Sequence, residues 1–146
     1  GLDATLEISY RYPQTKVIML TSLDNDNEVF YEAFLNGAYE YIYKYDFEQL
    51  PEAMIRAKQN PQSKYGERLR TLVFEQKKRL LTTTDIEILH GVVNSLTLSE
   101  IAEQKNVSVS AVKKQLNRLF RKFGWNGTGK ELAEKCLKWG LLDENQ

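Results

Sequence analysis

The chain has 146 residues, 42% of them hydrophobic and 27% charged, and its twenty basic side chains balance its twenty acidic ones. This length predicts one domain or two small ones, and the composition is that of a globular protein rather than a disordered one. A single cysteine excludes a disulfide framework, and a single histidine excludes a Ser-His-Asp triad or a multi-histidine metal site. No apolar run approaches the roughly 18 residues of a membrane span.

The balanced total hides an uneven distribution of charge along the chain. Residues 1–60 carry ten acidic and five basic side chains, a net charge of −5, whereas residues 61–80 carry two acidic and six basic ones, a net charge of +4. Residues 107–124 contain five basic side chains and no acidic one. This separation predicts two modules with different partners, joined by a basic connector.

The first sixty residues alternate helix and strand patterns. In chain order we expect a helix over residues 4–12 that Pro13 stops, a strand over residues 16–22, a helix over residues 25–36 that Gly37 ends, a strand over residues 39–43 and a helix over residues 46–59. The continuous apolar run 17–20 is typical of a parallel strand buried on both faces. The last helix takes Asp46 as its cap and places four side chains on its apolar side, Leu50, Met54, Ile55 and Ala57. This alternation is typical of an α/β fold, although two strands leave apolar edges open, so this half looks incomplete.

The rest of the chain shows helical periodicity alone. One apolar stripe at helical spacing (Tyr65, Leu69, Leu72 and Val73) predicts a linker helix within residues 61–80. Beyond it the patterns predict helices over residues 85–94, 98–105, 109–123 and 129–141. Their lengths and spacing predict an all-α second module.

Residues 98–123 carry the strongest functional pattern. A short helix, a tight turn through residues 106–108 and a long helix have helix-turn-helix spacing, in which Ala102 permits a close helix crossing and Val107 plugs the turn. Ser108 or Ser110 caps the long helix. Amide, hydroxyl and cationic side chains are expected on its outward face, a composition that suits a helix in the major groove. These residues are Ser110, Lys113, Lys114, Asn117, Arg118, Arg121 and Lys122. The alternative from the charge run alone is a solvated cationic face on a core helix.

These residues resemble the LuxR/NarL-type DNA-binding domain. The resemblance runs without a gap to about residue 142 and rests on Leu81–Thr82, Glu87–Leu89, Leu96–Thr97, Glu100–Ala102, Val107–Ser108, Val112–Lys113 and Leu119–Gly124. The sequence departs from that pattern where Ser95 replaces a common helix-ending glycine and Gln115 a frequent histidine. Gly127–Gly129 also replaces a common Arg-Thr-Glu, at the entry to the final helix.

The first half resembles the C-terminal half of a response-regulator receiver domain. The matching segments are Gly1–Asp3, Tyr12–Pro13, Lys16–Ser22, Asn36–Ala38 and Tyr41–Lys44. The whole chain is therefore similar to a NarL/FixJ-type response regulator that lacks the N-terminal part of its receiver. The implied architecture is a partial flavodoxin-like α/β receiver (residues 1–60), a helical linker (residues 61–80) and an all-α four-helix helix-turn-helix domain (residues 81–146).

The resemblance implies specific roles in the receiver half. Thr21 matches the switch hydroxyl that senses the phosphoryl group, Lys44 the lysine that pairs with the phosphorylated aspartate, and Tyr41 the aromatic residue that changes rotamer. Each also has an ordinary structural interpretation, as a strand end, a surface lysine and a packed strand residue. The family's acceptor aspartate and magnesium-binding acids match no position of this chain. We therefore expect no phosphoryl acceptance, no magnesium ion or other cofactor, and a sensor histidine kinase as partner only within a full-length parent protein.

The resulting hypothesis is a non-enzymatic, cytoplasmic transcription regulator that binds promoter DNA as a homodimer. Three side chains are expected to face the bases, namely Lys113, Lys114 and Asn117. Six others are expected to contact phosphates, namely Thr97, Ser108, Ser110, Arg118, Arg121 and Lys122. The resemblance implies a dimer interface on the final helix, through Leu132, Cys136 and Leu137. The alternative is a protein-interaction module that recruits a partner through the incomplete receiver half, with DNA binding vestigial.

Overall fold

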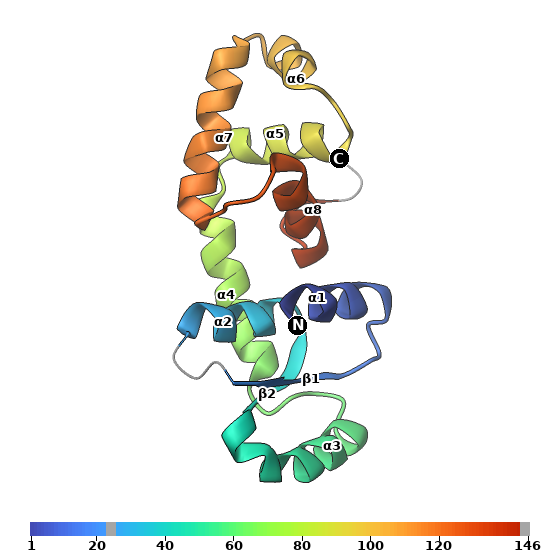
Figure 1. The fold of residues 1–146 in the computed structure, drawn as a ribbon. Coiled ribbons are helices and arrows are strands. Elements are labelled where there is room, and N and C mark those ends of the chain that lie inside the picture. Colours follow the sequence, from blue (N-terminus) through green and yellow to red (C-terminus); the bar gives the residue numbers. More distant parts are fainter. Residues whose placement is uncertain (23–25, 144–146) are drawn as a thin grey trace. The chain divides into compact units, whose positions relative to one another are not determined.

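The computed structural model describes residues 1–22 and 26–143, which form two compact units, one up to Glu75 and one from Gln76 onward (Figure 1). Helix α4 (Gly66–Leu80) begins in the first unit and ends in the second. No helix in the described part of the chain is long and apolar enough to cross a membrane.

The first unit contains the expected alternation of helices and strands. Its elements are α1 (Leu2–Arg11), β1 (Val17–Thr21), α2 (Asn27–Leu35), β2 (Ala38–Tyr43), the 3-10 helix η1 (Lys44–Gln49) and α3 (Leu50–Gln59). Asp26 caps α2 by accepting hydrogen bonds from two backbone N–H groups, and Gly37, at φ +102°, follows its end. Residue 25, at the expected start of this helix, lies outside the described residues. Strands β1 and β2 pair in parallel, as expected.

Strand β1 is more exposed than its apolar run indicates. All five of its residues are at least partly exposed, and Leu20 keeps 41% of its surface. The expectation of a strand buried on both faces is therefore wrong. The reason is that β2 is its only strand partner among the described residues, so β1 is an edge strand of a two-stranded sheet.

Aromatic side chains form the core of the first unit. Phe34 is fully buried, and the ring of Phe30 meets those of Phe34 and Tyr41 edge to face, with centroids 5.1 and 5.2 Å apart. Leu69, from the first part of α4, packs against the same cluster. Leu69 and Val73 from the predicted linker stripe therefore lie inward, whereas Leu72 remains 62% exposed.

Helix α3 differs from its prediction at its start and on its apolar side. Asp46 lies inside η1 with non-helical backbone angles and caps nothing, and α3 begins at Leu50. Pro51 accounts for this start because proline has no N–H to donate and is favoured in the first turn of a helix. Met54 and Ile55, which we expect on the apolar side, are 58% and 55% exposed, because Ala53 is the residue that turns inward.

The second unit consists of the end of α4 and four helices. These are α5 (Thr83–Val93), α6 (Leu98–Lys105), α7 (Val109–Phe123) and α8 (Gly129–Trp139), close to the predicted ranges. Helix α5 packs against α8, and α6 packs against α7. Gly91 permits a close approach of α6 to α5, since a β-carbon there would lie 2.7 Å from Ile101 Cγ1.

Candidate nucleic-acid interface

Helices α6 and α7 are joined by the tight turn that the spacing predicts. Asn106 ends α6 in the left-handed conformation at φ +55°, and the backbone N–H of Val107 donates to Ala102 O at 3.0 Å. Ser108 caps α7, because its hydroxyl oxygen accepts a hydrogen bond from Ala111 N at 3.1 Å. Val107 does not plug this turn as expected: its side chain is 45% exposed, and Ile101 and Ala102 fill the interior instead.

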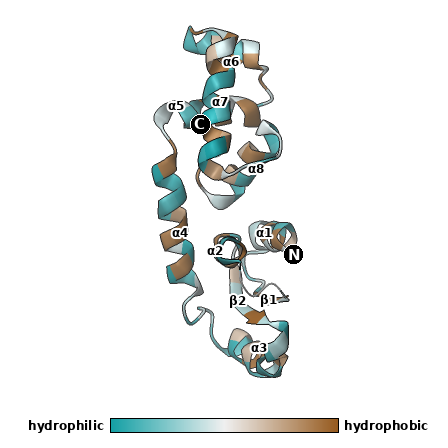
Figure 2. Ribbon diagram, turned by 60° about the vertical axis from the view of Figure 1, so that its left-hand side comes forward, coloured by the Kyte–Doolittle hydropathy of each residue, from teal (hydrophilic) through white to brown (hydrophobic). Residues whose placement is uncertain are grey.

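Helix α7 has one apolar and one polar side. Val112, Leu116 and Leu119 are at most 8% exposed and anchor the helix in the unit. The opposite side is exposed and carries the polar side chains of Ser110, Lys113, Lys114, Asn117, Arg118 and Arg121. Hydrophilic colour accordingly covers much of the α7 ribbon (Figure 2). No acidic residue lies within α7, so this side carries positive charge alone.

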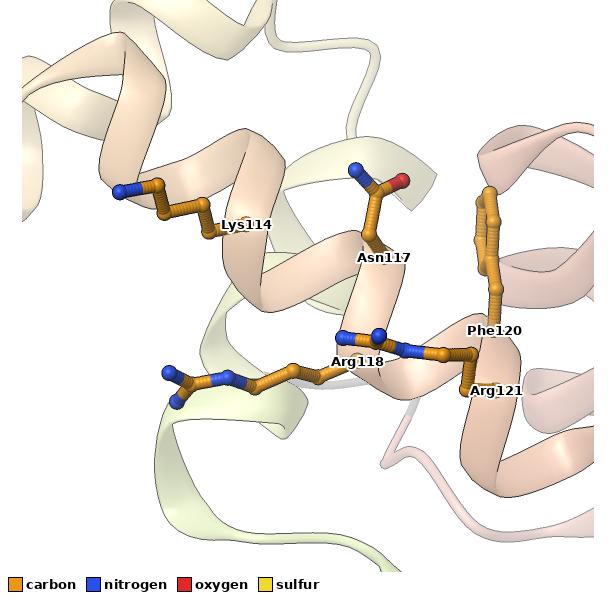
Figure 3. Close-up of a pocket in the computed structure, with 5 residues that line it drawn as sticks. All are labelled: Lys114, Asn117, Arg118, Phe120 and Arg121. Atoms are coloured by element: carbon orange, nitrogen blue, oxygen red, sulfur yellow. The ribbon is translucent and has the colours of Figure 1, made fainter.

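Part of this side forms an open hollow of about 570 Å³. It is lined by Lys114, Asn117, Arg118, Phe120 and Arg121. Figure 3 shows Lys114, Arg118 and Arg121 extending to one side of α7, whereas Asn117 and Phe120 point away from them. Guanidinium forks and an amide on a rigid helix can bind phosphate oxygens and base edges.

Lys122 is held by α5 rather than directed outward as predicted. Its ammonium group donates to Asp85 Oδ2 at 2.8 Å and to Leu80 O at 3.0 Å. Gln115 Nε2 donates to the other carboxylate oxygen of Asp85 at 2.8 Å. Asp85 is fully buried and also accepts from Thr82 N at 3.0 Å, completing the capping box of α5. Lys122 thus positions α7, and we remove it from the expected set of phosphate contacts.

The charges around Asp85 stabilise its ionised form. Burial raises the pKa of this carboxyl, but hydrogen bonds from Lys122, Thr82 and Gln115 outweigh it and lower the pKa below its ordinary value. The sequence patterns gave no indication that Gln115 and Lys122 contact Asp85. The partner residues lie 30 and 37 positions away, so no local pattern marks them.

Thr97 also has its donors engaged, contrary to the phosphate role expected of it. Both its backbone N–H and its hydroxyl donate to Glu100 Oε1, at 3.2 and 3.0 Å. Its hydroxyl oxygen accepts in turn from Glu100 N, which forms the capping box of α6. A carboxylate therefore occupies the place that a phosphate would need.

Two of the three expected dimer residues lie in the core. Leu132 and Cys136 are fully buried within the second unit, where α8 packs on α5, so neither side chain can form an interface between copies. The interface was implied by the resemblance alone, and apolar spacing on a helix does not separate a core position from an interface position. Leu137 is partly exposed on the same helix.

In the first unit, two of the three expected switch residues contact each other. Tyr41 is buried at the middle of β2, and burial raises its pKa while a hydrogen bond with Thr21 acts against that rise. Lys44 is exposed at the start of η1. Across residues 1–22 and 26–143, no three His, Cys, Asp or Glu side chains lie together as a metal site would require.

Comparisons with known proteins identify relatives of both halves. The chain is 30% identical over 128 residues to the response regulator protein VraR of Staphylococcus epidermidis (strain ATCC 35984) and 28% identical over 157 residues to the oxygen regulatory protein NreC of Staphylococcus aureus (strain JH9). These alignments cover 84% and 98% of this chain. The chain spans 61% of the length of VraR and 71% of that of NreC.

A solved structure of the Salmonella typhimurium RcsB response regulator matches 92% of this chain and 67% of its own, with 19% identity and a TM-score of 0.42. A family model described as the vWA-MoxR associated protein N-terminal HTH matches residues 63–139, just over half of the chain. The match includes α4, which we expect to be a separate linker, and its description names a helix-turn-helix. The chain belongs to this family of vWA-MoxR associated protein N-terminal helix-turn-helix domains.

Proposed function

We propose that this chain is a sequence-specific DNA-binding regulator of transcription, with α7 lying in the major groove of a duplex. The observation that carries the proposal is the exposed side of α7, where amide, hydroxyl and cationic side chains stand on a helix anchored by Val112, Leu116 and Leu119. The match of residues 63–139 to a helix-turn-helix family and the similarity to VraR support it.

Three neighbouring side chains read the bases in this proposal. Lys113 and Lys114 precede Asn117 by about one helical turn, so each lies beside it on the helix surface, and all three are exposed. Lysine donates to the guanine acceptors and asparagine pairs with adenine in the major groove. The amide of Asn117 therefore offers the most base-specific contact of the three.

Phosphate contacts come from both ends of α7. Ser108 and Ser110 lie at its N-terminus, where backbone N–H groups favour an anion and no acidic residue occupies the first turn. Arg118 and Arg121 lie toward its C-terminal end and are exposed. These contacts hold the helix in register without reading sequence.

We propose further that the chain binds DNA as a dimer through the exposed side of α8, with Leu137 at the contact. The support is the partial exposure of this leucine on a helix whose other apolar residues are buried. Leu137→Glu then shifts the complex from two chains per duplex to one in sedimentation equilibrium. An unchanged ratio with Leu137→Glu rejects the interface.

In a longer parent protein that carries an acceptor aspartate, Thr21, Tyr41 and Lys44 act as the switch that a sensor histidine kinase drives. The hydrogen bond between Thr21 and Tyr41 supports this role, because it links the end of one strand to the aromatic core. Loss of phosphorylation-dependent DNA binding in a parent protein carrying Thr21→Ala tests it. An unaltered response to the kinase rejects it.

A second candidate function rests on apolar side chains that the first unit exposes. Leu20, Met54 and Ile55 are 41%, 58% and 55% exposed, as expected of a module that docks another protein. Salt separates the two functions, because binding through phosphates weakens steeply with added salt and apolar docking does not.

The proposed function is tested by selecting bound duplexes from a random pool with the 146-residue chain and with its Lys113→Ala/Lys114→Ala variant. We expect the unchanged chain to enrich a motif and the double variant to lose it. A matched control, Arg68→Ala/Arg70→Ala, removes the same charge from exposed positions of α4 and keeps the motif. Failure to enrich, or the same motif from the Lys113→Ala/Lys114→Ala variant, rejects base reading by α7.

A further inference from the structure

The end of α4 carries two cations that neither packing nor ion pairing uses. Lys78 and Arg79 are exposed in its last turn. Among the described residues, neither forms an ion pair. They stand within a connector whose net charge is +4, in a chain whose total charge is zero.

This turn of α4 is fixed to the C-terminal end of α7. The ammonium group of Lys122 donates to the carbonyl oxygen of Leu80 at 3.0 Å. The ammonium group of Lys77 lies 5.2 Å from the ring centre of Phe123. Both contacts join residues of the second unit, which runs from Gln76 onward, so the last turn of α4 and the last turn of α7 keep one arrangement.

The same end of α7 bears Arg118 and Arg121, whose guanidinium groups extend to one side of the helix (Figure 3). A helix that reads a major groove contacts bases mainly through its N-terminal part, so its C-terminal end approaches the phosphate backbone beside the groove. Cations fixed next to that end are placed to neutralise phosphates in the same backbone.

We infer that the last turn of α4 is a second phosphate-binding element, in which Lys78 and Arg79 extend the contact of α7 along the backbone of duplex DNA. This inference rests on the proposed function. Its ligand is the sugar-phosphate backbone of a duplex, so it adds affinity equally for every sequence and adds no base preference.

The test is a titration of the full 146-residue chain by fluorescence anisotropy, at several salt concentrations, on the selected duplex and on a scrambled one. Lys78→Gln/Arg79→Gln is expected to lower affinity for both duplexes by the same factor. It is also expected to reduce the slope of log K against log salt by about 1.8, since each phosphate contact contributes about 0.9. Arg68→Gln/Arg70→Gln removes equal charge from α4 two turns or more away and is expected to keep the slope.

The outcomes separate this inference from the proposed function. Binding by the unchanged chain with the same slope in Lys78→Gln/Arg79→Gln overturns the second element and leaves α7 as the reader. An equal loss in the Arg68→Gln/Arg70→Gln control also overturns it, because the effect is then one of total charge. Absence of duplex binding by the unchanged chain overturns both. Circular dichroism melting confirms that each variant is folded.

Discussion

Replacing Asp85 by alanine is expected to destabilise the second unit strongly. The substitution removes a fully buried carboxylate that accepts from Lys122, Gln115 and Thr82 N at 2.8, 2.8 and 3.0 Å. Removing one partner of a buried ion pair costs about 3–5 kcal/mol because the other charge is left without compensation. The side chain of Lys122 is 30% exposed and can regain some hydration, so we expect about 2–4 kcal/mol.

Glu100→Ala is the matched control for this substitution. Glu100 and Asp85 hold the same third position in the capping boxes of α6 and α5, each three residues after a threonine. Glu100 is exposed, so its removal is expected to cost only about 0.3–1 kcal/mol. The difference between the losses of unfolding free energy in the two variants measures how much the buried contact of Asp85 with α7 stabilises the unit.

The assay is urea unfolding of the full chain followed by tryptophan fluorescence. The chain has two tryptophans, Trp125 and Trp139, and both lie in the second unit, so the signal reports that unit alone. If Asp85→Ala loses no more unfolding free energy than Glu100→Ala, the ion pair contributes nothing to stability and the expected value is wrong.

Three further predictions concern the same unit. The pKa of Asp85 is lower in the folded than in the unfolded chain, so its contribution to stability is complete above the unfolded pKa and is lost as pH falls through the folded pKa. Urea midpoints measured from pH 6 to pH 2 are therefore expected to fall less for Asp85→Asn than for the unchanged chain, and parallel curves reject this. Ser95 holds φ +62°, so Ser95→Gly is expected to raise the unfolding free energy by about 1 kcal/mol in the same assay, and a lower urea midpoint contradicts it. Burial raises the pKa of the Cys136 thiol to about 12, while the charge of Lys77 acts to lower it. Iodoacetamide at pH 8 is therefore expected to label this buried thiol only after unfolding, and rapid labelling of the native chain would exclude the packing described.

Local patterns predicted the second unit well because its signals are local. The ranges expected for α6 and α7, residues 98–105 and 109–123, agree with the structure, since Thr97 and Ser108 cap them and Asn106 ends the first. Such caps and helical periodicity depend on residues within one or two turns.

The errors arise where a side chain depends on a distant partner. Helical spacing placed Lys122 on the polar side of α7, but Asp85 holds it from another helix. The apolar spacing of Leu132 and Cys136 fits a core and an interface equally, but both side chains are buried where α8 packs against α5. Met54 and Ile55 show the reverse case, an apolar pattern that no described element covers. Periodicity identifies the apolar side of a helix, whereas the tertiary fold determines whether that side contacts another element or solvent.

Selection of duplexes with an Asn117→Arg variant tests whether side chains of α7 read bases. Asparagine pairs with the N6 and N7 atoms of adenine, whereas arginine pairs with the O6 and N7 atoms of guanine. Asn117 is exposed in the middle of α7, so the substitution leaves the packing of the helix unchanged. We expect adenine in the selected motif to be replaced by guanine at one position of each site. A motif identical to that of the unchanged chain would contradict it.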